Sequence, residues 1–165
     1  MKALPIPPAG ESTPSRTNPA VRILVVDDEV SFRQLTLEVL MGSGYDVEGA
    51  EDGAAGWEAL SSCAYDLLIT DNNMPKLTGV DLLRKLRSAR MALPVIMVTG
   101  AAPTHEFASS PWLIPDAMLL KPFTCDELLG QVKEVLRVNY GNDADYGQNA
   151  PPDRWDADHS RDLKV

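Results

Sequence analysis

Short apolar runs alternate with amphipathic segments along the middle of the chain. Residues 21–26 have the sequence Val-Arg-Ile-Leu-Val-Val, and this apolar, β-branched run predicts a buried strand. In the next segment apolar residues recur three to four positions apart, which predicts a helix. The buried face of this helix is expected to hold Phe32, Leu35, Val39 and Leu40. Gly42 and Gly44 are expected to end it.

The alternation continues to about residue 138. Further strands are predicted at 45–49, 66–70, 94–99 and 117–120, and further helices at 53–61, 80–88 and 125–138. Strands joined by helices favour a parallel sheet with helices on both faces. Five strands in this rhythm predict an α/β fold of the flavodoxin-like, doubly wound kind, with strand order 2-1-3-4-5.

One segment, 103–115, breaks the helical pattern. It contains Pro111 and Pro115 where a helix between the fourth and fifth strands is expected. A proline inside a helix removes a backbone hydrogen bond and clashes with the preceding turn, at a cost of about 3 kcal/mol. We therefore expect the fourth helix to be short or distorted.

The two ends of the chain differ in composition from the middle. Residues 1–20 contain five prolines, and residues 139–165 contain six Asp against three basic residues. Neither stretch has the periodic apolar residues of a packed element. The expected organisation is a disordered arm at 1–20, one domain at 21–138 and an acidic, flexible tail at 139–165.

Charge and cysteine content narrow the class of protein. The net charge of -9 argues against direct binding to nucleic acid or to an anionic membrane. No apolar run approaches the roughly 20 residues of a membrane span. The two cysteines, Cys63 and Cys125, have no metal-ligand spacing and do not suggest a disulfide framework. A cytoplasmic protein is expected.

Residues with carboxylate, hydroxyl or ammonium side chains follow four of the predicted strands. Asp27 and Asp28 come after the first strand, Asp71 after the third, Thr99 after the fourth and Lys121 after the fifth. In open parallel sheets, ligands bind outside the carboxyl ends of the strands. These five residues are therefore expected to lie together at one edge of the sheet.

Three carboxylates at one sheet edge would repel each other unless a cation joined them. Mg²⁺ suits such a site, because it prefers oxygen ligands and retains several waters. Asp71 could then act as a nucleophile toward a phosphoryl group, while Lys121 neutralises the transferring oxygens. The Thr99 hydroxyl could donate a hydrogen bond to a phosphoryl oxygen.

The same residues carry a family resemblance over about residues 20–140. The matching motifs are Val-Val-Asp-Asp-Glu at 25–29, Thr-Asp-Asn-Asn-Met-Pro at 70–75 with Gly79 after it, Val-Thr-Gly at 98–100 and Lys-Pro-Phe at 121–123. In this order they resemble the receiver domain of response regulators, the phosphorylated switches of two-component signalling.

The resemblance implies a role for each matching residue. The implied roles are Asp71 as phosphoacceptor, Asp27, Asp28 and the Asn73 backbone carbonyl as further Mg²⁺ ligands, Thr99 as switch hydroxyl and Lys121 as phosphate partner. It also implies a sensor histidine kinase or a histidine phosphotransfer protein as one partner and an unidentified protein downstream. The receiver is expected to act alone, as a phosphoacceptor with limited activity of its own and not as an enzyme.

The chain departs from the family at its expected output surface. Receivers commonly have an aromatic residue three positions before the lysine, and here that position is Met118. A thioether can repack but has no ring to rotate. Together with the proline-rich segment, this residue predicts that phosphorylation is communicated unusually, through the region of Trp112.

Two other functions remain as alternatives. A Mg²⁺-dependent phosphohydrolase with an aspartyl-phosphate intermediate would place a second acid two residues beyond its nucleophile. That position is Asn73 after Asp71 or Glu29 after Asp27, and only Glu29 is acidic. A pseudo-receiver that only binds a partner is disfavoured, because the acids, the threonine and the lysine are all present.

Overall fold

The computed structural model describes residues 20–140 of the 165-residue chain. The predicted arm before residue 20 and the predicted tail from residue 141 onward lie outside the described residues. Asn139 and Tyr140, which we assigned to the tail, instead complete the last helix.

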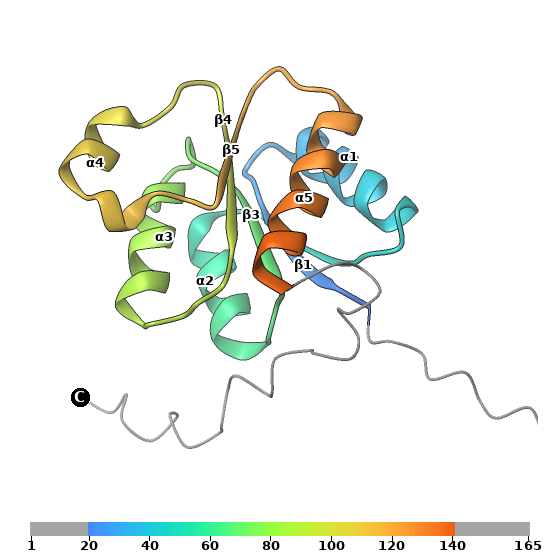
Figure 1. The fold of residues 1–165 in the computed structure, drawn as a ribbon, viewed down its shortest axis with the longest axis horizontal. Helices are drawn as coiled ribbons and strands as arrows, with labels where there is room; N and C mark the ends of the chain where they lie inside the picture. Colours follow the sequence, from blue (N-terminus) through green and yellow to red (C-terminus); the bar gives the residue numbers. More distant parts are fainter. Residues whose placement is uncertain (1–19, 141–165) are drawn as a thin grey trace, which may run out of the picture.

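Five parallel strands form a single sheet in the order β2-β1-β3-β4-β5 (Figure 1). The strands are β1 (Arg22–Val26), β2 (Asp46–Ala50), β3 (Leu67–Asp71), β4 (Val95–Thr99) and β5 (Ala117–Leu120). All adjacent pairs are parallel. The predicted doubly wound fold is confirmed.

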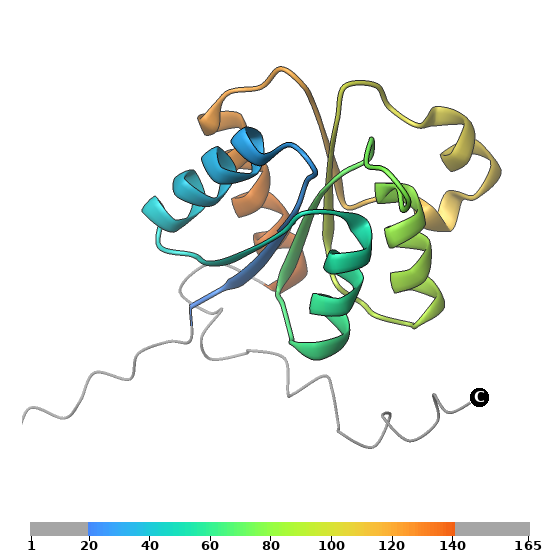
Figure 2. The same ribbon diagram turned by 180° about the vertical axis from the view of Figure 1, so that it is seen from behind.

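Helices cover both faces of this sheet. They are α1 (Val30–Gly42), α2 (Gly53–Ser62), α3 (Gly79–Ser88), α4 (Thr104–Ser109), the 3₁₀ turn η1 (Pro111–Leu113) and α5 (Cys125–Tyr140). Helices α1 and α5 lie on one face of the sheet, and α2 and α3 lie on the other (Figures 1 and 2). The predicted bounds of these strands and helices lie within two residues of the observed ones.

Alternate residues of the central strands enter two separate hydrophobic cores, because successive side chains of a strand point to opposite faces. The core under α2 and α3 contains Leu24, Val26, Leu68, Val95 and Met97. The core under α1 and α5 contains Ile23, Val25, Leu67, Ile69, Ile96 and Val98. With both faces buried, the central strands β1, β3 and β4 are predominantly apolar, as parallel strands of this kind are.

The buried face of α1 differs from the predicted one. Leu35 is 52% exposed, whereas its neighbour Thr36 is buried together with Leu40. Residues 32, 36 and 40 are four apart and share one side of the helix, so Leu35 is rotated away from the sheet. Placing Leu35 in the core was therefore wrong.

The proline-rich segment forms a six-residue α4 followed by the turn η1. Pro111 stands at the start of η1, where its missing N–H costs no hydrogen bond. The prediction of a short or distorted fourth helix is confirmed. The segment nevertheless anchors itself, because Leu113 is fully buried in the core beneath α2 and α3.

Within residues 20–140, none of the helices has both the length and the apolar composition needed to cross a membrane.

Candidate functional site

The predicted acids converge at the carboxyl ends of the strands. Asp27 follows β1 and Asp71 ends β3, and these two strands are neighbours in the sheet. Carboxylate oxygens of Asp27, Asp28 and Asp71 lie within 4.8 Å of one another. Asp27 is 2% exposed and Asp71 is 6% exposed, whereas Asp28 faces solvent.

Backbone contacts hold Asp27 in place at the start of α1. The Glu29 N–H donates to Oδ1 of Asp27 at 2.8 Å, and the Asp27 N–H donates to the Ala50 carbonyl at 3.2 Å. The Arg33 guanidinium donates to the Asp27 carbonyl oxygen. Oδ1 of Asp27 is thus fixed by the backbone, and Oδ2 accepts a hydrogen bond from the Lys121 ammonium.

The loop between β3 and α3 fixes Asp71. The Asn72 N–H donates to Oδ1 of Asp71 at 2.8 Å, and the Asn72 side chain accepts from the Val80 N–H at 3.1 Å. A Cβ at Gly79 would clash with the Asp71 carbonyl oxygen and approach Asn72 Cα to 2.9 Å. Only glycine allows α3 to begin so close to the phosphoacceptor candidate.

Lys121 joins the acids from the far side of the sheet edge. Its Nζ lies 3.2 Å from Oδ2 of Asp27 and 3.8 Å from Oδ1 of Asp71. The peptide bond between Lys121 and Pro122 is cis. The structure thus brings together Asp27, Asp28, Asp71 and Lys121 at the carboxyl ends of the strands, as predicted.

Sequence reasoning missed a residue that packs on this lysine. The ring centroid of Phe32 lies 4.1 Å from Nζ of Lys121, which is cation–π geometry. Phe32 also meets Phe123 edge to face, with 5.5 Å between ring centroids. Phe32 was expected only as a core residue, and nothing in the sequence indicated that the start of α1 would cover the end of β5.

The electrostatics of Asp71 follow from its position. Burial raises the pKa of this carboxyl above its usual range, and nearby Asp27 raises it further. Lys121 and the N–H groups of Asn72 and Asn73 act in the opposite direction but do not cancel the effect. The structure therefore places a carboxylate where a cation would stabilise its charged form.

Thr99 ends β4, one position beyond the partner of Asp71 in the sheet, and is fully buried. Its hydroxyl donates to the Ala101 carbonyl oxygen at 2.9 Å. Among the described residues, no hydrogen bond joins this hydroxyl to Asp71. Thr99 thus lies on the predicted edge, but in this structure its hydroxyl is bonded within the loop after β4.

The donor set fits a hard divalent cation. Three carboxylates provide oxygen ligands, and the Asn73 carbonyl accepts no hydrogen bond from any residue of the described range 20–140. Carboxylate and carbonyl oxygens are the ligands that Mg²⁺ takes in phosphoryl-transfer sites. Asp28 is exposed, so the cation would remain open to water and to a substrate phosphate.

Comparison with known proteins agrees with this geometry. A family model described as the response regulator receiver domain matches residues 23–133, more than half of the chain. The transcriptional regulatory protein DltR of Streptococcus agalactiae is 34% identical over 113 residues, which cover 68% of this chain and 50% of the relative. The response regulator MprA of Mycobacterium tuberculosis is 35% identical over 125 residues, 76% of this chain and 54% of the relative. The matched part spans about half the length of these relatives.

Solved structures show the same fold. A CheY-like receiver domain protein from Methanospirillum hungatei has a TM-score of 0.68 at 32% identity and covers 72% of this chain and 95% of its own. The response regulator TrrA of Thermotoga maritima, solved in complex with Mg²⁺ and BeF, has a TM-score of 0.62 at 33% identity and covers 70% of this chain and 98% of its own. This chain therefore belongs to the response regulator receiver domain family.

Proposed function

We propose that this receiver accepts a phosphoryl group on Asp71 and acts as a switch in two-component signalling. The observation that carries the proposal is the arrangement around one buried carboxylate. Asp71 lies between the acids that follow β1 and the ammonium of Lys121, which is 3.8 Å away. Like charges gathered in this way cost stability, so their placement is better explained by chemistry than by folding.

The reaction is an in-line transfer. An Asp71 carboxylate oxygen forms a bond to phosphorus, while the bond from phosphorus to the donor's leaving group breaks. The donor is a phosphohistidine or a small acyl phosphate. Lys121 stabilises the negative charge on the phosphoryl oxygens, and the Thr99 hydroxyl turns from Ala101 to one of these oxygens once the phosphoryl group is present.

The implied Mg²⁺ ion would be held by Asp27, Asp28, Asp71 and the Asn73 carbonyl. When bound, it would neutralise the carboxylates and offset charge on the transferring phosphoryl group. The Glu29 N–H fixes Oδ1 of Asp27, and Lys121 donates to Oδ2.

The test is incubation of the full chain with Mg²⁺ and acetyl phosphate, followed by intact mass measurement. The expected result is a gain of one phosphoryl group that is absent in Asp71→Asn and in samples treated with a chelator. Asp126→Asn is the matched control, because Asp126 is an exposed carboxylate in the first turn of α5. That variant should be phosphorylated like the wild-type protein.

Other outcomes would contradict the proposal. Release of many phosphates per protein molecule without a stable adduct would indicate a phosphohydrolase. An adduct that persists in Asp71→Asn would place the phosphoacceptor elsewhere. Absence of both an adduct and Mg²⁺ binding would indicate a pseudo-receiver.

The upstream partner in this proposal is a sensor histidine kinase or a histidine phosphotransfer protein. The downstream partner is another protein. The relatives DltR and MprA are about twice as long as the matched part. The net charge of -9 supports a protein partner rather than direct contact with nucleic acid.

We place the output of this switch around η1 and β5. Trp112 is 53% exposed, Ile114 is 56% exposed and Leu120 is 53% exposed, and Met118 replaces the usual aromatic residue on β5. On phosphorylation, amide hydrogen exchange is expected to change at residues 111–120 more than in α5. Unchanged exchange in this segment, with full phosphorylation verified by mass, would refute this assignment.

A further inference from the structure

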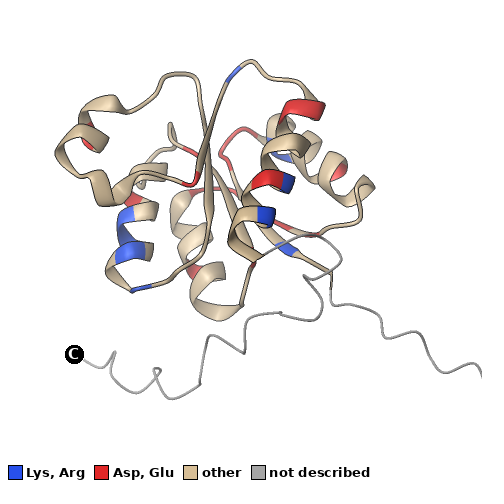
Figure 3. Ribbon diagram, in the orientation of Figure 1, with Lys and Arg blue, Asp and Glu red and all other residues tan. Residues whose placement is uncertain are grey.

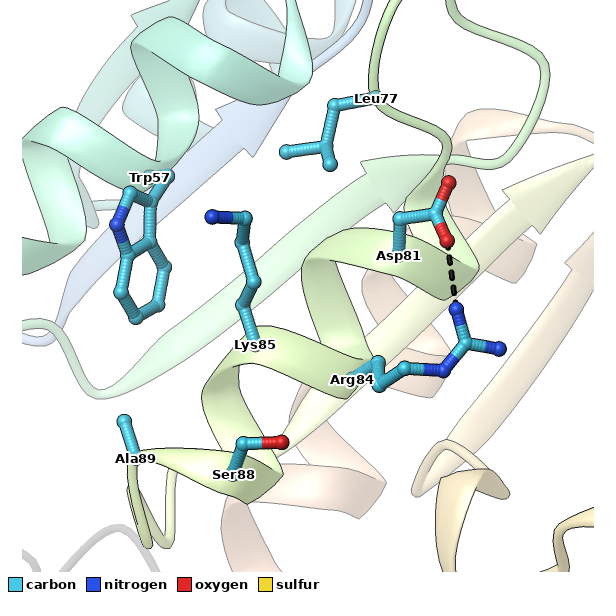
Figure 4. Close-up of a pocket in the computed structure, with 7 residues that line it drawn as sticks. All are labelled: Trp57, Leu77, Asp81, Arg84, Lys85, Ser88 and Ala89. Carbon is cyan, nitrogen blue, oxygen red and sulfur yellow. Dashed lines mark hydrogen bonds and ion pairs between the residues drawn. The ribbon is translucent and has the colours of Figure 1, made fainter.

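The acids Asp27, Asp28 and Asp71 and the ammonium of Lys121 form what we call the strand-end site. A groove between α2 and α3 lies outside it (Figure 4). It has a volume of about 480 Å³, and its walls include Trp57 on α2, Leu77 in the loop before α3, and Arg84 and Lys85 on α3. Cavities of this size accept a bulky side chain together with its neighbours. The groove therefore offers apolar surface with cations at its edge.

Positive charge is concentrated beside this groove. Four of the chain's 15 Lys and Arg residues, Arg84, Lys85, Arg87 and Arg90, lie within the seven residues 84–90. Figure 3 shows this basic face on α3. In a protein with a net charge of -9, such a cluster is a local exception that would attract an acidic segment.

The structure does not neutralise all of these charges. Arg84 pairs with Asp81 at 2.6 Å, and Arg87 pairs with Asp116 at 3.5 Å. The Lys85 ammonium lies 5.2 Å from the ring centroid of Trp57, and no carboxylate among residues 20–140 pairs with it. The Arg90 guanidinium likewise has no acidic partner in that range. Of these two cations, Lys85 lines the groove, and Arg90 directly follows the lining residue Ala89 in sequence.

We propose that the occupant is the chain's own segment 153–158, with the sequence Asp-Arg-Trp-Asp-Ala-Asp. Trp155 supplies a large apolar ring for the surface formed by Trp57 and Leu77. Three Asp residues flank that ring and would pair with the cations of Lys85 and Arg90. Apolar surface and charge are therefore complementary over the same short stretch.

The segment can reach the groove. The Tyr140 hydroxyl donates to the Asp66 carbonyl at 3.2 Å, so α5 ends beside the start of β3. Arg87 donates to the Leu93 carbonyl at 3.1 Å, so α3 ends beside the start of β4, the neighbour of β3. Both helices thus end at the amino edge of the sheet.

Fifteen residues carry the chain from Tyr140 to Trp155. When extended, they span up to about 50 Å. That reach exceeds the radius of gyration of about 14 Å expected for a domain of this size. Intramolecular docking is therefore sterically open and needs no second molecule.

The test uses the full chain labelled with ¹⁵N and compares Trp155→Ala with the wild-type protein by NMR. Removal of the ring is expected to shift the Trp57 indole N–H signal and the amide signals of Leu77 and Lys85. The double variant Asp156→Asn, Asp158→Asn is expected to shift the same signals in the same direction, because it weakens the charge pairing.

Trp112→Ala is the matched control. Its ring is exposed and lies outside the groove, so the Trp57 and Lys85 signals should remain in place. Unchanged groove signals in Trp155→Ala would overturn the proposal. Shifts that depend on protein concentration would also overturn it, because the occupant would then come from a second copy of the chain.

Discussion

The strand-end site and the segment from α4 to η1 depart from ordinary packing in opposite ways. The site gathers the carboxylates of Asp27, Asp28 and Asp71 within 4.8 Å, a grouping that disfavours the folded state without a cation. The segment shortens its helix to six residues, yet it buries Leu113 completely. The segment therefore has little regular structure, but one buried apolar side chain anchors it.

This difference separates two kinds of constraint. At the site, the identity and charge of each side chain matter, because the chemistry depends on them. In the segment, the buried position requires an apolar residue of suitable size. Substitutions at the site should therefore change chemistry, and substitutions at the segment's anchor should change stability.

The largest expected effect is on phosphoryl transfer in Lys121→Ala. Among residues 20–140, the Lys121 ammonium is the cation that pairs with the carboxylates of both Asp27 and Asp71, and its loss leaves charge on the phosphoryl oxygens uncompensated. Removal of one such group typically lowers the rate about 100-fold or more. The measurement is the rate of adduct formation with acetyl phosphate and Mg²⁺, with exposed Lys133 on α5 replaced by Ala as control. Equal rates in the two variants would contradict the role of Lys121.

The next effect is on stability in Leu113→Ala. This side chain is fully buried in the core under α2 and α3, so truncation is expected to lower the free energy of unfolding by about 2–5 kcal/mol. Ile114→Ala is the control, because its neighbouring side chain is 56% exposed and the loss should be about 0.5 kcal/mol or less. Urea unfolding measures both. Similar losses would mean that η1 does not anchor the segment.

The strand-end residues could be predicted because topology fixes their meeting point. In a parallel sheet with this strand order, residues after β1, β3, β4 and β5 must share one edge, whatever the loops do. The meeting of Asp27, Asp71 and Lys121 at one edge follows from that rule alone. The proline rule likewise predicted the short α4, since it depends on local backbone chemistry.

Tertiary details could not be predicted in the same way. The rotation of α1 decides that Thr36 rather than Leu35 is buried, and a hydrophobic pattern cannot resolve a rotation of about 100°. The contact of Phe32 with Lys121 joins residues far apart in sequence, so no local pattern contains it. The burial of Leu113 depends on the path of η1, which prolines disrupt without specifying a replacement.

The smallest effect concerns the stability cost of the site itself, measured without Mg²⁺ in Asp71→Asn. The pKa of Asp71 is raised in the folded state, chiefly by burial, so the folded state binds more protons than the unfolded state between the two pKa values. The wild-type free energy of unfolding should therefore fall as pH rises from about 4 through the raised pKa, by at most about 1.4 kcal/mol per pH unit for one proton.

Asn at position 71 is uncharged at every pH and escapes this loss. The stability of the variant relative to wild type should thus increase over the same pH window and become constant above it. Urea unfolding across a pH series in chelator measures the difference, and a repeat with Mg²⁺ should reduce it near neutral pH, since a cation bound by the folded state stabilises the wild-type protein. A difference that does not vary with pH would show that the Asp71 carboxyl does not carry the cost. That result would assign the stability cost of the site to Asp27 and Asp28.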